Sequence, residues 1–132
     1  LESLYWLGVR AKNCLIGKID NMTIDQWEPY GKDPVITVKD TLTALRSLMV
    51  KKNLTILNAS TRIIIVPGYK FRMIRGIITN FHQPRSTLLL LISAWTGASW
   101  QKIYKYALEN GFRFLSYGDS SLLFSSLYQN SV

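Results

Sequence analysis

Four segments of the chain have the hydrophobic pattern of a helix. In three of them apolar residues recur every three or four positions, which places them on one face. The other segment, Leu88–Trp95, is apolar on all sides and is therefore expected to be buried. Thr37, Ser86 and Ser99 stand where N-caps are expected, because their hydroxyl oxygens can accept a hydrogen bond from the first turn. The predicted helices cover residues 3–12, 38–53, 88–95 and 100–109.

Runs of β-branched and aromatic residues between these segments predict short strands. The run Ile63–Val66 is typical of a strand that is covered on both faces. Other candidate strands lie at residues 24–28, 55–57, 71–74, 76–79, 112–115 and 122–124. Because helices alternate with apolar strands, the predicted class is α/β, with three α/β/α layers around a mixed, mainly parallel sheet. The sequence has no internal repeat or linker, so a single domain is expected.

The composition of the chain limits the class of protein. Its 132 residues are 48% hydrophobic and 18% charged, which excludes an intrinsically disordered or low-complexity chain. A single cysteine excludes an internal disulfide framework. That cysteine and the one histidine, His82, are too few for a His/Cys zinc cluster, so no metal is expected.

Positive charge is concentrated in the middle of the chain. There are 16 Lys and Arg residues against 8 Asp and Glu residues, a net charge of +8, and no acidic residue occurs between Asp40 and Glu109. A positive face of this kind attracts polyanions such as nucleic acids. An ordinary basic surface that keeps a protein soluble has the same composition, so the charge is compatible with both interpretations.

The apolar runs and the first residues of the chain indicate where in the cell the protein is located. The longest unbroken apolar run, Leu88–Ile92, is far shorter than the roughly 20 residues that a membrane span needs. No basic and apolar leader is visible, and we expect a soluble, cytoplasmic protein. Leu1 already lies in the pattern of the first helix, so we also expect the sequence to be a piece of a longer protein.

A polar segment between a predicted strand and a predicted helix is the first candidate site. It contains Asn80, His82, Arg85, Ser86 and Thr87. Ligands of α/β sheets bind beyond the strand ends, and helix N-termini offer free N–H groups to anions. An imidazole at this place is suited to acid–base chemistry near neutral pH. Capping by Asn80 and Ser86, with His82 as a bonded loop residue, would explain the same residues without a ligand.

A second polar turn, Ser116–Ser121, follows the predicted strand at residues 112–115. Asp119 in this turn can act as a general base or bind a cationic ligand. An Asx turn that joins two strands is the structural alternative. The chain contains no G-x-G or G-x-S-x-G spacing, which argues against a dinucleotide fingerprint, a P-loop or a hydrolase nucleophile elbow.

Aromatic and basic residues alternate in a third segment, Pro67–Arg72. This interleaving suits base stacking combined with phosphate contacts. Alternate packing of Tyr69 and Phe71 into a core gives the same pattern.

Together these motifs resemble the S-adenosylmethionine:tRNA ribosyltransferase-isomerase family of queuosine biosynthesis. The residues that carry the resemblance are Pro67–Phe71, Ile78–His82, Pro84, Ser86–Leu88 and Phe112–Asp119, and Leu1–Ser3 is similar to the end of a further family motif. The likeness is close over residues 60–124 and poor over residues 13–58. It implies that residues 1–132 are the C-terminal part of the family's α/β catalytic domain, without its N-terminal half and its inserted β-barrel.

The resemblance implies an enzyme that acts on S-adenosylmethionine and tRNA. Members transfer and isomerise the ribosyl group of S-adenosylmethionine onto 7-aminomethyl-7-deazaguanine at the tRNA wobble position, which gives epoxyqueuosine and releases adenine and methionine. The implied partners are the tRNA anticodon stem-loop and the missing N-terminal half of the same polypeptide, with no membrane and no metal. This piece alone is expected to be inactive. A basic RNA-binding module without catalytic activity is the alternative, and a conventional methyltransferase is disfavoured by the missing glycine-rich turn.

The resemblance also gives roles to the candidate residues. His82 and Asp119 are the implied catalytic residues, as bases for the C5′ proton beside the sulfonium. The implied substrate-binding residues are Tyr69, Asn80, Ser86, Thr87, Tyr117 and Gly118. The implied contacts to tRNA phosphates are Lys70, Arg72, Arg75 and Arg85. These roles require that the loop of His82 and the loop of Asp119 form the walls of one cleft.

Overall fold

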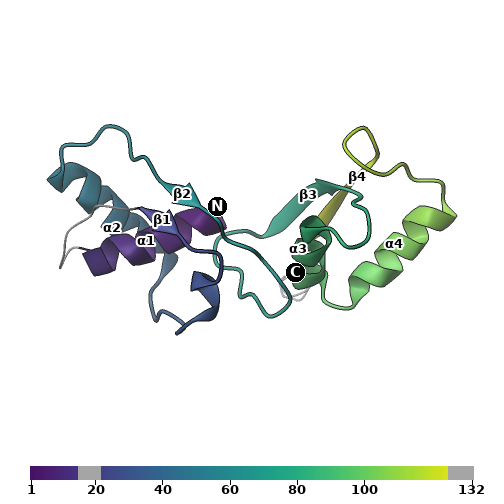
Figure 1. The fold of residues 1–132 in the computed structure, drawn as a ribbon, viewed down its shortest axis with the longest axis horizontal. Helices are drawn as coiled ribbons and strands as arrows, with labels where there is room; N and C mark the ends of the chain where they lie inside the picture. Colours follow the sequence, from purple (N-terminus) through teal and green to yellow (C-terminus); the bar gives the residue numbers. More distant parts are fainter. Residues whose placement is uncertain (15–21, 125–132) are drawn as a thin grey trace, which may run out of the picture. The chain divides into compact units, whose positions relative to one another are not determined.

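Figure 1 shows the protein in a computed structural model, which describes residues 1–14 and 22–124. The elements along the chain are α1 (Glu2–Cys14), β1 (Thr23–Ile24), the 3-10 helix η1 (Glu28–Tyr30), α2 (Val38–Lys51), β2 (Ser60–Thr61), β3 (Gly76–Asn80), α3 (Thr87–Thr96), α4 (Ser99–Glu109) and β4 (Ser120–Phe124). By its contacts the chain divides into two compact units. The first consists of residues 1–64 and 71–73, and the second consists of residues 65–70 and those from residue 74 onward. The single domain stays a prediction.

The first unit is built on the contact between α1 and α2. Their apolar faces meet in a buried core that includes Ala11, Leu45 and Leu48. The predicted N-cap of α2 is confirmed, because the Thr37 hydroxyl oxygen accepts the Asp40 N–H at 3.1 Å. Both helices therefore form where the apolar spacing and the cap predict them.

The first unit also contains a parallel pairing of β1 with β2. Isolated hydrogen bonds continue this pairing, since the Arg62 N–H donates to the Ile24 carbonyl at 3.0 Å and the Ile64 N–H to the Gln26 carbonyl at 3.3 Å. The predicted strand Ile63–Val66 is wrong, because β2 ends before it and its side chains are half-buried instead of covered on both faces. The predicted strand at residues 24–28 overlaps β1 only at Ile24, because a turn at residues 26–27 and then η1 follow.

In the second unit β3 pairs with β4 in antiparallel register, from Gly76 opposite Phe124 to Asn80 opposite Ser120. The sheet is tied to α3, because the indole N–H of buried Trp95 donates to the Leu123 carbonyl at 3.2 Å. An aromatic cluster with ring centroids 5.4 to 5.9 Å apart joins the end of β3, α4 and the chain after α4; its members are Phe81, Tyr104, Phe112 and Phe114.

The two helices of the second unit, α3 and α4, form where they are predicted, but two details of the prediction are wrong. Ser86 caps α3 as predicted, and its hydroxyl accepts a first-turn N–H at 3.2 Å. The predicted cap at Ser99 is wrong, because Ala98 occupies the N-cap position and offers no side-chain acceptor. The predicted complete burial of α3 is also wrong, since Leu88 and Leu90 are exposed.

Three further segments predicted as strands, residues 55–57, 71–74 and 112–115, are not strands in the described structure. In the second of them, the backbone N–H groups of Arg72 and Met73 donate to the Glu2 carboxylate and are unavailable to a sheet ladder. In the third, Leu115 has a φ of 72°, outside the extended region. Contacts distant in sequence and local backbone geometry override strand propensity here.

The fold class is α/β. In residues 1–14 and 22–124 the strands form two separate two-stranded sheets, one parallel and one antiparallel. A three-layer arrangement around a mainly parallel sheet remains a prediction for the longer protein. Across the same residues, every helix is too short or too polar to cross a lipid bilayer.

Candidate functional site

The structure joins the two loops that carry the predicted catalytic residues. Asn80, the last residue of β3, donates its side-chain amide to the carbonyls of Leu115 at 3.0 Å and Ser116 at 3.1 Å. Its amide oxygen accepts the Ser120 hydroxyl at 2.9 Å. The predicted substrate-binding residue Asn80 thus links the two loops through both ends of its amide.

A second link fixes the same loops. The Leu115 N–H donates to the Phe81 carbonyl at 2.8 Å. The Phe81 ring packs against Phe112 and Phe114, with centroids 5.5 and 5.4 Å away. The loop after β3 and the loop before β4 therefore form one packed platform.

His82 stands on this platform with a defined ring orientation. Its Nε2 lies 2.7 Å from the Thr79 hydroxyl, and its backbone N–H donates to the Tyr104 hydroxyl at 3.1 Å. The side chain is half-buried. Among the described residues nothing bonds Nδ1, and the catalytic role of His82 stays a prediction.

Asp119 is held by its own turn. Its Oδ2 accepts the Arg113 N–H at 2.7 Å, its N–H donates to the Arg113 carbonyl at 2.8 Å, and the Arg113 guanidinium lies 3.6 Å from Oδ1. These contacts, the backbone hydrogen bond first, hold the pKa of Asp119 below its ordinary value. The carboxylate therefore supports the turn at neutral pH and loses this role only as the pH falls through the lowered pKa. A carboxylate with a lowered pKa is a weaker base, so the geometry favours the structural alternative for Asp119.

The two residues before Asp119 differ in what they can contact. A Cβ at Gly118 would lie 2.3 Å from the Arg113 carbonyl oxygen, so the turn closes only around a glycine. Tyr117 is 96% exposed and is therefore accessible to a ligand. Gly118 has a clear structural role, whereas the substrate-binding role of Tyr117 stays a prediction.

Three predicted residues of the first loop do line a pocket of about 230 Å³ at the start of α3. Its lining consists of Arg85, Ser86, Thr87, Leu89, Leu90, Ser93 and Trp100. The lining includes neither His82 nor Asp119. The shared cleft between the two loops therefore stays a prediction, although the loops themselves are in contact.

The remaining predicted residues lie in different surroundings. Tyr69 is buried, which favours core packing over ligand contact. Lys70 and Arg75 are exposed, as is Arg85. The Arg72 guanidinium pairs with Asp33. This pairing competes with a phosphate contact.

Glu2 is the important residue that sequence reasoning missed. It is 5% exposed, and its carboxylate accepts the backbone N–H groups of Arg72 at 3.0 Å and of Met73 at 2.8 Å. It thereby fixes the backbone that carries Arg72, whose guanidinium also lies 5.6 Å from the centre of the Tyr5 ring. The only signal in the sequence is an acidic residue in the first turn of an otherwise apolar helix face.

Comparison with known proteins identifies the family of this chain. A sequence model described as "Queuosine biosynthesis protein" matches residues 19–123. The chain belongs to this family. The similarity to the family therefore includes most of residues 13–58, the stretch whose motifs resemble the family poorly.

Two similar members are both named S-adenosylmethionine:tRNA ribosyltransferase-isomerase. The protein of Chelativorans sp. (strain BNC1) is 42% identical over 113 residues, 82% of this chain and 32% of that protein. The protein of Halothermothrix orenii is 48% identical over 92 residues, 67% of this chain and 27% of that protein. The chain therefore spans about a third or less of the family members that it matches.

A solved structure also shows similarity. It is the crystal structure of an S-adenosylmethionine tRNA ribosyltransferase from Thermotoga maritima, 34% identical, with a TM-score of 0.49. The match covers 61% of this chain and 30% of that chain.

Proposed function

We propose that the full-length protein transfers and isomerises the ribosyl group of S-adenosylmethionine onto 7-aminomethyl-7-deazaguanine at the tRNA wobble position, forming epoxyqueuosine. The observation that carries this proposal is family membership across residues 19–123. The named relatives support it, since their names state both substrates and the reaction type. A protein that acts on tRNA would work in the cytoplasm, which is the location we propose.

The platform in the second unit supports an acid–base role for His82. The Thr79 hydroxyl orients the ring, and the aromatic packing under Phe81 keeps the loop in place. In the proposed reaction His82 Nδ1 accepts the C5′ proton next to the sulfonium. The pocket at the N-terminal end of α3 binds an anionic part of a substrate, through Arg85, Ser86 and Thr87. Exposed Lys70, Arg75 and Arg85 contact tRNA phosphates.

Two labelled forms of S-adenosylmethionine test the reaction in the full-length protein. We expect the label of the ribosyl group to enter an anticodon stem-loop that carries 7-aminomethyl-7-deazaguanine, whereas the label of the methyl group stays with methionine. Methyl label in the RNA would indicate a methyltransferase. RNA binding without either label in the RNA would indicate a binding module and would contradict the proposal.

One face of the β3–β4 sheet in the second unit exposes apolar side chains that the rest of the polypeptide can cover. Ile78 is 77% exposed, and on the same face lie Leu122, its partner on β4, and Phe124, at 57% and 65%. Apolar side chains gathered on one sheet face normally pack against another layer. The relatives are at least three times longer than the stretch matched here. We therefore propose that the part of the protein outside this chain covers this face and extends the structure to three layers.

The substitution Ile78→Thr tests this cover in the full-length protein. Threonine keeps the β-branched shape but places a hydroxyl in the covered face, so we expect a loss of about 1–2 kcal/mol in the free energy of unfolding. Val50→Thr is the matched control, since Val50 is 73% exposed on α2. Equal and negligible effects of the two substitutions in urea denaturation would show that the face is open to solvent.

A further inference from the structure

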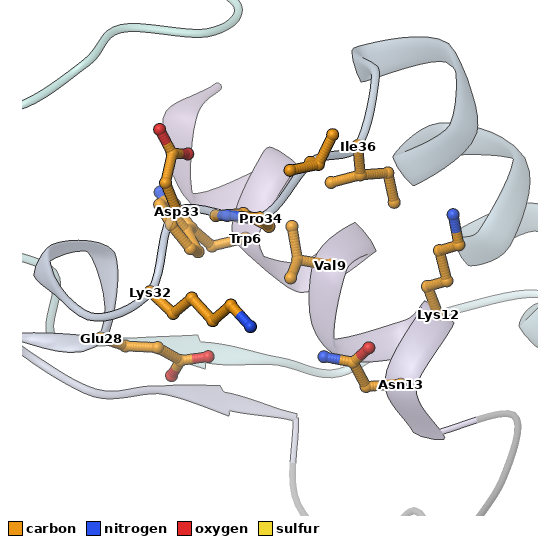
Figure 2. A pocket seen from close by; sticks show the side chains of 10 residues that line it. Trp6, Val9, Lys12, Asn13, Glu28, Lys32, Asp33, Pro34 and Ile36 are labelled. Carbon is orange, nitrogen blue, oxygen red and sulfur yellow. The ribbon is translucent and has the colours of Figure 1, made fainter.

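A cavity of about 550 Å³ lies in the first unit, where the side chain of Trp6 forms part of its wall (Figure 2). Two lysines, Lys12 and Lys32, line it together with two carboxylates, Glu28 and Asp33. Because charged groups of both signs line the cavity, its charges point to no particular ligand. The second unit, by contrast, holds a defined set of contacts around one residue with chemical potential.

That residue is His82, whose backbone is held by a hydroxyl group from α4. β3 ends at Asn80, so His82 lies beyond the ladder that pairs β3 with β4. Its N–H donates instead to the Tyr104 hydroxyl at 3.1 Å, from a residue 22 positions later in the chain. A partly buried N–H without an acceptor is costly, so this bond replaces at His82 what the ladder no longer supplies.

The Tyr104 ring is fixed by aromatic neighbours. The residue is only 8% exposed. The ring centroids of Phe81 and Phe114 lie 5.5 and 5.9 Å from its own. The ring of Trp100, one turn earlier on α4, lies at 5.9 Å. A ring packed on several sides keeps its hydroxyl in one place, and a buried tyrosine hydroxyl usually has a hydrogen-bond partner, which here is the His82 N–H.

His82 is therefore held at two points, one on its ring and one on its backbone. The Thr79 hydroxyl of β3 lies 2.7 Å from Nε2, and the Tyr104 hydroxyl of α4 accepts the backbone N–H. The first contact orients the ring, and the second fixes the backbone from which the ring projects. Misplacement of a reacting group by about 1 Å can slow a reaction on the order of a hundredfold, so both contacts bear on a proton transfer.

We propose that Tyr104 is a positioning residue, whose hydroxyl holds the His82 backbone so that the imidazole keeps its place relative to the substrate. This inference rests on the proposed function, in which His82 accepts the C5′ proton. Trp100, which packs against the Tyr104 ring, also lines the pocket at the start of α3. The ring of Tyr104 thus contacts the wall of the proposed substrate pocket, whereas its hydroxyl contacts the loop of the proposed base.

The variant Tyr104→Phe of the full-length protein removes the hydroxyl and keeps the ring. We expect single-turnover ribosyl transfer to fall about tenfold. The affinities for the stem-loop and for S-adenosylmethionine should stay unchanged, because the ring still packs against Trp100. Tyr106→Phe is the matched control on the same helix, since Tyr106 is 61% exposed and its hydroxyl bonds to no residue that the structure describes. We expect this control to transfer the ribosyl group at the wild-type rate.

A double-mutant cycle with His82→Ala shows whether Tyr104 acts through His82. In the His82→Ala background we expect Tyr104→Phe to change the transfer rate by less than about twofold, because the hydroxyl then holds a backbone without the base. A merely structural role would slow both backgrounds by the same factor. A further tenfold loss in the His82→Ala background would therefore overturn the proposal.

Amide hydrogen exchange measures the same contact without the reaction. In full-length protein labelled with nitrogen-15 at histidine, the amide signal that His82→Ala lacks belongs to His82. We expect this amide to exchange in heavy water about tenfold faster in Tyr104→Phe than in the wild type or in Tyr106→Phe. Equal exchange in the three proteins, or equal transfer by the two tyrosine variants, would overturn the proposal. Absence of ribosyl transfer by the wild-type protein would instead contradict the proposed function, and the exchange rates would still decide whether Tyr104 positions His82.

Discussion

The His82→Ala variant of the full-length protein is expected to lose single-turnover ribosyl transfer by about 10²–10⁴-fold, the usual contribution of a positioned acid–base group. The loss should appear in the rate of the chemical step and leave the affinity for the stem-loop unchanged. In the proposed reaction His82 Nδ1 accepts the proton, which requires that Nε2 carry the ring hydrogen and donate it to the Thr79 hydroxyl 2.7 Å away.

Two further variants separate chemistry from structure in this test. Thr79→Val removes the hydroxyl that orients the ring but keeps the shape of the side chain, so a smaller loss of rate is expected. Asp119→Asn should loosen the turn closed by Arg113 and affect stability at neutral pH more than it affects the chemical step. Single-turnover transfer by His82→Ala within a few-fold of wild type would remove His82 from the chemistry.

The helices were predictable because the signals that define them are local. Apolar spacing sets the buried faces of α1 and α2, and the caps Thr37 and Ser86 lie three residues before the N–H groups that they accept. The end of α3 is also set locally, since Gly97 follows its last residue with a φ of 58°, a conformation that favours glycine. The prediction of Ser99 as the N-cap of α4 was wrong because Ala98, which has no side-chain acceptor, occupies that position.

The strands were less predictable because pairing depends on distant partners. The segment after Tyr69 has strand propensity, but its N–H groups donate to Glu2, seventy residues away in the chain. The segment before Ser116 packs its aromatic rings on Phe81 and bends at Leu115. Apolar runs alone do not say which of these outcomes occurs.

The candidate site was predictable only in part. The motifs identified both loops, and the structure joins them through Asn80. The reciprocal hydrogen bonds between Asp119 and Arg113 were not visible in the sequence, because they depend on how the turn closes.

The close contact of α1 with α2 leads to the second large prediction. A Cβ added at Gly8 would lie 2.4 Å from the Thr41 Cβ and 2.6 Å from the Thr41 carbonyl oxygen, and Thr41 is fully buried. Because one of these atoms belongs to the backbone, the two helices must move apart to admit even a methyl group. We expect Gly8→Ala to lower the free energy of unfolding by about 3 kcal/mol, as overpacked sites do.

Gly31→Ala is the matched control for this substitution. Its φ is −73°, and an added Cβ would meet the Glu28 carbonyl oxygen at an ordinary 3.5 Å, so a small effect is expected. Urea denaturation followed by circular dichroism measures both variants. The second substitution Thr41→Ala should not rescue Gly8→Ala, since the Thr41 Cβ and backbone remain in place. A Gly8→Ala variant as stable as Gly31→Ala would mean that α1 and α2 are farther apart than described and that Gly8 is not needed for their contact.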